Sequence, residues 1–129
     1  MKAVMLAAGV GARLGLAVTE HPPKVLLRFG GKSLLQRHIE ILRRQGIGEL
    51  VLGVGYHQEE IEQEIADLGA EDFVRTVFNA NYDEGNIVTL WTLRDELCSG
   101  GPVLLMDADV LYDEGLVRRL VTSPHQNCL

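Results

Sequence analysis

The chain alternates short apolar segments with segments of helical periodicity, and this alternation constrains its fold more than any other feature. Strands are predicted at 2–7, 50–54, 73–78 and 103–106, and helices at 33–45, 58–68, 86–97 and 114–121. Strands that alternate with helices are typical of a parallel sheet with helices on both faces. We therefore expect an α/β fold, a three-layer α/β/α sandwich with a mostly parallel sheet, in which ligands bind at the carboxyl ends of the strands.

The helical segments carry caps and apolar faces that can be read directly. Ser33 can cap the first helix with Gln36 as its capping-box partner, and Asp113 can cap the last one. In the third helix the predicted buried side consists of Ile87, Leu90, Trp91 and Leu97, which makes Trp91 a core residue rather than a stacking platform. The histidines lack metal-ligand spacing, so surface or capping roles are expected for His21, His38, His57 and His125.

Composition restricts the class of protein. With 129 residues, of which 47% are apolar, the chain can build a domain with a core, and we assign 1–129 to a single domain. A net charge of −6 argues against general binding of nucleic acid. The apolar runs are too short for membrane insertion and the N-terminus does not read as a signal peptide, so a cytoplasmic location is expected. Composition leaves a homo-oligomer possible.

A glycine-rich segment follows the first predicted strand and reads Leu6-Ala7-Ala8-Gly9-Val10-Gly11-Ala12-Arg13. Residues with small side chains let the backbone approach phosphate oxygens, and successive N–H groups can surround them. Arg13 adds a fork of donors suited to phosphate, and Lys24 follows two prolines. A cationic loop facing a glycine loop predicts a site for a triphosphate.

Two other phosphate-binding motifs fit less well. A dinucleotide-binding loop needs a third glycine where this chain has Leu14, and a P-loop ending at 31–33 needs a glycine where it has Leu26. A turn before a capped helix is the simpler interpretation of 31–33. An NAD-dependent oxidoreductase is therefore the weakest of the functions considered.

Three sequence blocks occur in order along the first part of the chain: LAAGVGARL at 6–14, PKVLL at 23–27 and GGKSLL at 30–35. Together they resemble the opening signature of the superfamily of sugar-phosphate and phosphocholine nucleotidyltransferases. Gly55-Tyr56 and Asp107-Ala108-Asp109 match further positions of that family. The resemblance implies a Rossmann-like fold of the nucleotide-diphospho-sugar transferase type. It also implies that 1–129 is the nucleotide-binding part of a longer domain, truncated at its C-terminus.

The resemblance assigns roles to the matched residues. Arg13 and Lys24 would be catalytic, with Arg13 on the β- and γ-phosphates and Lys24 at the charge on the α-phosphorus. The predicted nucleotide-binding residues are Leu6, Ala7, Ala8, Gly9, Gly11, Tyr56, Tyr82, Gly85, Asn86 and Asp107. Asp109 would bind Mg²⁺, the expected cofactor. Asp107 could be a second ligand or a loop-capping aspartate.

The segment EGNIVTLW at 84–91 is more similar to phosphocholine-type cytidylyltransferases than to the sugar-type enzymes. The resemblance thus implies that the protein transfers NMP from an NTP, with CTP favoured, to a small phosphorylated acceptor such as phosphocholine, and releases pyrophosphate. A sugar-1-phosphate nucleotidyltransferase and a non-catalytic nucleotide-binding module on the same fold are the alternatives. In the family a second metal-binding aspartate is expected beyond Leu129.

Overall fold

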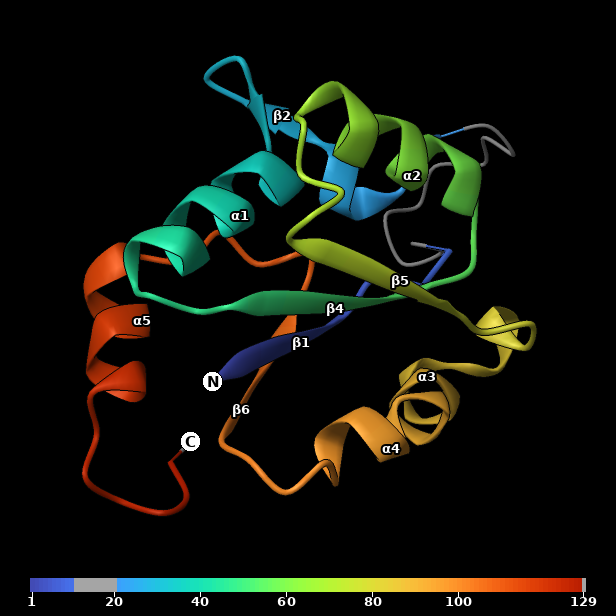
Figure 1. Ribbon diagram of the computed structural model, residues 1–129. Helices are drawn as coiled ribbons and strands as arrows, with labels where there is room; N and C mark the ends of the chain where they lie inside the picture. Colours follow the sequence, from blue (N-terminus) through green and yellow to red (C-terminus); the bar gives the residue numbers. More distant parts are fainter. Residues whose placement is uncertain (11–20, 129) are drawn as a thin grey trace.

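The computed structural model describes residues 1–10 and 21–128, and a four-stranded sheet forms the centre of this part of the chain (Figure 1). Its strands are β1 (Lys2–Leu6), β4 (Glu49–Val54), β5 (Val74–Phe78) and β6 (Val103–Asp107). They lie in the order β5-β4-β1-β6, and every neighbouring pair is parallel. The chain moves from β1 through β4 to β5 and then returns to place β6 on the other side of β1. The strand order therefore reverses at β1, which is where such sheets bind ligands.

Helices cover both faces of the sheet. In Figure 1, α1 (Leu34–Arg44), α2 (Gln58–Asp67) and α5 (Glu114–Val121) lie on one side of the strands, and α3 (Asn86–Thr92) and α4 (Arg94–Leu97) lie on the other. The predicted three-layer α/β/α sandwich with a parallel sheet is confirmed. Within 1–10 and 21–128, no helix combines the length and the apolar character that crossing a bilayer requires.

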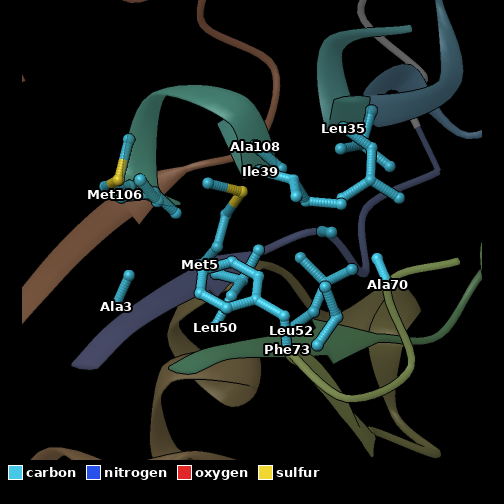
Figure 2. Close-up of a cluster of buried hydrophobic side chains, with 14 of the residues drawn as sticks. Ala3, Met5, Leu35, Ile39, Leu50, Leu52, Ala70, Phe73, Met106 and Ala108 are labelled. Carbon is cyan, nitrogen blue, oxygen red and sulfur yellow. The ribbon is translucent and has the colours of Figure 1, made fainter. Parts of the chain in front are cut away.

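The strands send alternate side chains to the two faces of the sheet. Ala3 and Met5 of β1 belong to the larger core cluster, together with Leu35 and Ile39 of α1 (Figure 2). Val4, which lies between them in sequence, belongs to a second cluster on the side of α3 and α4. One central strand therefore anchors both helical layers, and this holds its carboxyl end in a defined place.

The predicted third helix is divided in two at Leu93, and it turns a different side to the sheet. Thr89 and Leu93 are buried, whereas the predicted core residues Ile87 and Trp91 are 71% and 68% exposed. Gly53 of β4 explains this arrangement, because a Cβ atom there would lie 2.8 Å from Leu93 Cδ1 and 2.9 Å from Thr89 Cγ2. The glycine lets that side of α3 approach β4 closely. The prediction of a buried Trp91 is therefore wrong.

The N-terminal cap of α1 is confirmed in part. The N–H of Gln36 donates to Ser33 Oγ at 3.1 Å, as predicted. The Gln36 side chain instead donates along the helix to Glu40 Oε1 at 3.0 Å and does not complete a capping box. Ser33 Oγ in turn donates to Glu64 Oε1 at 2.7 Å, which ties α1 to α2. Asp113 caps α5 as predicted.

Short elements that periodicity did not predict lie between the longer ones. They are η2 (Lys24–Leu26), a hairpin of β2 (Arg28–Phe29) and β3 (Lys32–Ser33), and η3 (Tyr82–Glu84). Gly30 and Gly31 form the hairpin turn with positive φ, a backbone conformation that glycine adopts without strain. The interpretation of 31–33 as a turn before a capped helix is confirmed in part: Gly31 lies in the turn and Ser33 caps α1, but Lys32–Ser33 is the strand β3.

Candidate functional site

A pocket lies at the carboxyl ends of β1 and β6. Its lining residues are Leu6, Ala7, Gly9, Lys24, Val25, Asn86, Asp107, Ala108 and Asp109. With the exception of Val25 and Ala108, the sequence predicts each of them as a catalytic, nucleotide-binding or metal-binding residue. The fold thus brings together residues from distant parts of the chain.

The acidic side of the pocket is formed by the end of β6. The strand continues as far as Asp107, and a turn then carries Ala108 and Asp109. Ala108 is 3% exposed and belongs to the core, whereas both aspartates are exposed. Successive residues of an extended chain point to opposite sides, so Asp107 and Asp109 share a side and Ala108 takes the other. Both carboxylates therefore lie at the pocket, as expected for a strand that reaches Asp107.

The basic side of the pocket is formed by Lys24. It opens η2 directly after Pro23, and the following residue, Val25, is 1% exposed and anchors this short helix in the core. Lys24 Nζ donates to Asp109 Oδ2 at 3.2 Å. The two side chains are 27% and 46% exposed, and a pair this accessible contributes at most about 1 kcal/mol to stability. Both groups can therefore exchange this partner for a ligand at small cost.

The backbone after β1 is fixed at the edge of the pocket. The N–H of Ala7 donates to the C=O of Gly53 at 2.8 Å, and Ala7 and Ala8 are buried. Gly9 then faces α3, since a Cβ atom on it would lie 3.9 Å from Asn86 Oδ1. The start of the glycine loop and the N-terminus of α3 thus form adjacent walls of the pocket.

Helix α3 begins at Asn86, and Gly85 takes the cap position with a φ of 100°, which favours glycine. Asn86 is therefore the first helical residue rather than the cap, and it lines the pocket. Gly11 and Arg13, the other residues predicted for the phosphates, lie outside the described residues. Their roles stay predictions.

Tyr56 and Tyr82 are not among the described residues that line the pocket, although the N–H of Tyr56 donates to the C=O of Ala8 at 3.2 Å. Tyr56 is 8% exposed, and its hydroxyl donates to the C=O of His21 at 2.8 Å. Its ring stacks on His57 with 4.0 Å between centroids and meets Tyr82 edge-on at 6.5 Å. A Cβ atom on Gly55 would overlap the Tyr82 side chain, which explains the glycine before Tyr56. That either tyrosine binds nucleotide stays a prediction.

Sequence reasoning missed His38 and Tyr112. His38 on α1 is 1% exposed, and its Nε2 lies 2.9 Å from the C=O of Ala108, so the prediction of a surface or capping role is wrong. The hydroxyl of Tyr112 accepts a hydrogen bond from the N–H of Asp107 at 3.0 Å. His38 lies on the same helical face as the buried leucines of α1, and this spacing could have revealed it.

The buried imidazole makes stability depend on pH. Burial lowers the pKa of His38, and the hydrogen bond to Ala108 opposes this only in part. An unfolded histidine has a pKa of about 6.5, so the unfolded chain takes up this proton at a higher pH than the folded chain. The free energy of unfolding should therefore be highest above the unfolded-state pKa of about 6.5. It should fall as the pH drops from there through the lower folded-state pKa. Melting temperatures measured from about pH 7.5 to 5 should fall less in His38→Gln than in the parent. An equal decrease in the melting temperatures of the two proteins would contradict the role given to His38.

The donors at the acidic turn fit a divalent cation that arrives with a nucleotide. In the described part of the chain, no group of three or more His, Cys, Asp or Glu side chains is placed to hold a metal ion. Asp107 and Asp109 nevertheless offer carboxylate oxygens at one pocket. Mg²⁺ commonly takes one or two carboxylates and completes its coordination with phosphate oxygens and water. The residues present therefore fit Mg²⁺ bound together with a triphosphate.

Known proteins resemble this chain in sequence and in fold. Residues 3–128 match the family model described as the MobA-like NTP transferase domain. The chain is 35% identical over 123 residues to a choline-phosphate cytidylyltransferase of Streptococcus pneumoniae, covering 95% of this chain and 50% of that protein. It is 31% identical over 116 residues to a probable mannose-1-phosphate guanylyltransferase of Oryza sativa subsp. japonica, covering 88% of this chain and 32% of that protein.

A solved structure agrees with these sequence matches. The CTP:phosphocholine cytidylyltransferase from Streptococcus pneumoniae superposes with a TM-score of 0.72 at 35% identity, over 88% of this chain and 47% of that chain. The chain thus spans about half the length, or less, of the proteins that it matches. The family match includes both the glycine loop after β1 and the acidic turn after β6. This chain belongs to the family of MobA-like NTP transferase domains.

Proposed function

We propose that the protein is a nucleotidyltransferase that transfers NMP from an NTP, preferably CTP, to a small phosphorylated acceptor such as phosphocholine, and releases pyrophosphate. The observation that carries this proposal is the pocket in which Lys24 Nζ lies 3.2 Å from Asp109 Oδ2, beside Asp107 and the backbone of the glycine loop. A cation, two carboxylates and a backbone of small residues are the groups that a triphosphate and its Mg²⁺ require. Membership of the family supports the same reaction.

In this reaction a phosphate oxygen of the acceptor forms a bond to the α-phosphorus of the NTP. The bond from that phosphorus to the oxygen bridging the α- and β-phosphates breaks, and pyrophosphate leaves with the electron pair. Lys24 would stabilise the negative charge that develops on the α-phosphate. Asp109 and Asp107 would hold Mg²⁺, which supplies positive charge along the triphosphate when bound. The backbone at Ala7 and Gly9 would position the phosphates, so catalysis would rest on positioning and electrostatics.

The choice of substrates rests on the relatives. CTP and phosphocholine are favoured by the similarity to a choline-phosphate cytidylyltransferase. A sugar-1-phosphate nucleotidyltransferase is the second candidate, because the chain also matches a probable mannose-1-phosphate guanylyltransferase. A pyrophosphate-release screen of the full-length protein, with several NTPs and phosphorylated acceptors, tests both. If no combination of NTP and acceptor releases pyrophosphate, the non-catalytic nucleotide-binding module is the function that remains.

Because its proposed substrates are nucleotides, we expect the protein to act in the cytoplasm.

We expect CTP with Mg²⁺ to raise the melting temperature of the chain more than UTP, GTP or dTTP does. A ligand at about 100 times its Kd adds roughly 2.7 kcal/mol to the free energy of unfolding, which corresponds to a shift on the order of 10 °C for a domain of this size. Thermal unfolding with each nucleotide at the same concentration measures the difference. A larger shift with another nucleotide would exclude the cytidylyltransferase and leave the nucleotidyltransferase proposal intact.

A further inference from the structure

The turn after β6 is held at three backbone positions. The N–H of Ala108 donates to the C=O of Leu6 on β1 at 3.2 Å. The C=O of Ala108 lies 2.9 Å from Nε2 of His38 on α1. The N–H of Asp107 donates to the hydroxyl of Tyr112 at 3.0 Å. Ala108, between the two aspartates, is therefore hydrogen-bonded to β1 through its N–H and to α1 through its C=O.

His38 makes its hydrogen bond from a position that favours an apolar residue. The other buried residues of α1 are Leu34, Leu35, Ile39, Ile41 and Leu42. A carbonyl oxygen only accepts hydrogen bonds, so in the neutral imidazole of His38 Nε2 carries the proton and Nδ1 does not. Nδ1 is buried and has no hydrogen-bond partner among the described residues, which is unfavourable for a polar atom. A leucine at this position could fill the core but could not make the hydrogen bond to Ala108.

Tyr112 supports the same turn from the following loop. Its ring centroid lies 5.6 Å from that of His38, and it packs against the larger core cluster. Its hydroxyl accepts the backbone N–H of Asp107, so the hydrogen bond is made to the peptide group and not to the carboxylate.

We propose that His38 and Tyr112 are positioning residues that orient the carboxylates of Asp107 and Asp109 toward the metal ion of a metal–nucleotide complex. The inference rests on the proposed function. Both side chains bind backbone groups of the turn, so they leave the oxygens of the two carboxylates to other partners. A turn fixed through its peptide groups presents these oxygens in a defined geometry, as outer-shell partners do at metal sites.

The test compares His38→Leu with His38→Gln in the full chain. Leucine removes the donor, whereas Nε2 of glutamine can donate to Ala108 in its place. Binding of Mn²⁺ in the presence of CTP, followed by electron paramagnetic resonance, should weaken about 10–100-fold in His38→Leu and much less in His38→Gln. Tyr112→Phe, which loses only the hydroxyl, should weaken it as well. Leu42→Ala, on the same buried face one turn further along α1, is the control for lost stability and should bind Mn²⁺ like the parent.

Hydrogen exchange at the amides of 107–109 is measured in parallel, because it reports on the turn without any metal. Exchange should be faster in His38→Leu than in Leu42→Ala or the parent. Unchanged Mn²⁺ binding in a folded His38→Leu overturns the inference, whatever the exchange rate. If the parent binds no Mn²⁺ with CTP, the proposed function fails at this pocket. The exchange rates then decide by themselves whether His38 holds the turn.

Discussion

Replacing Lys24 with alanine is expected to lower kcat by about 10²–10³, the loss that follows removal of a preorganised contact to developing charge. Among the described residues, Lys24 is the cationic one that lines the pocket, where it pairs with Asp109 in the turn after β6. The affinity for NTP should change far less, because the glycine-loop backbone and Arg13 would still hold the triphosphate. Pyrophosphate release by the full-length protein, together with a separate nucleotide titration, measures the two effects.

Lys32→Ala is the matched control for this experiment. Lys32 is also a partly exposed lysine, but its Nζ pairs with Glu40 Oε2 at 2.8 Å and does not line the pocket. Its replacement should leave turnover at the parental level. If Lys24→Ala also kept the parental kcat, another group would have to stabilise the charge at the α-phosphate, and the role given to Lys24 would be wrong.

Asp109→Ala is expected to abolish the Mg²⁺ dependence of NTP binding. Among the described residues, it removes one of the two carboxylates that line the pocket and leaves Asp107 as the other. Mg²⁺ bound with a triphosphate relies on one or two such carboxylates, so the loss of the one that the family resemblance assigns to the metal should release it. The ion pair with Lys24 is partly exposed and contributes at most about 1 kcal/mol, so the chain should stay folded. Calorimetric titration with CTP, with and without Mg²⁺, measures the effect.

Asp95→Ala controls for the loss of an aspartate as such. Asp95 is 90% exposed on α4, and its removal should leave the binding of Mg·CTP as in the parent. An Asp109→Ala variant that retained full Mg²⁺ dependence would mean that the metal is held elsewhere. The match of 107–109 to the metal position of the family would then be incorrect.

The strands and the first helix could be predicted because their signals are local. The segment predicted as a strand at 2–7 is β1 (Lys2–Leu6), and the helix predicted at 33–45 is α1 (Leu34–Arg44). β1 is a short apolar segment that is buried on both faces, and the buried residues of α1 follow helical spacing after a serine cap. The place of the pocket followed from the same signals, since parallel strands bring their carboxyl ends to one edge of the sheet.

The partner of His38 and the outward position of Trp91 show what local signals do not contain. The partner of His38 is the C=O of Ala108, which is 70 residues away in the sequence. Trp91 is turned outward because Gly53, on another strand, admits Thr89 and Leu93 instead. Helical periodicity identified an apolar side of α3 but could not show which side the sheet would accept. Both features depend on how distant segments meet.

The ion pair between Lys24 and Asp109 makes the pocket respond differently to a complete substrate and to its parts. A free divalent cation has to displace the ammonium group from Asp109. A free triphosphate has to draw Lys24 away and leave the Asp109 carboxylate close to its own negative charge. The Mg·NTP complex offers a cation to one residue and an anion to the other in a single event. Under the proposed function, metal and nucleotide are therefore coupled ligands, and each should raise the affinity for the other by the same factor.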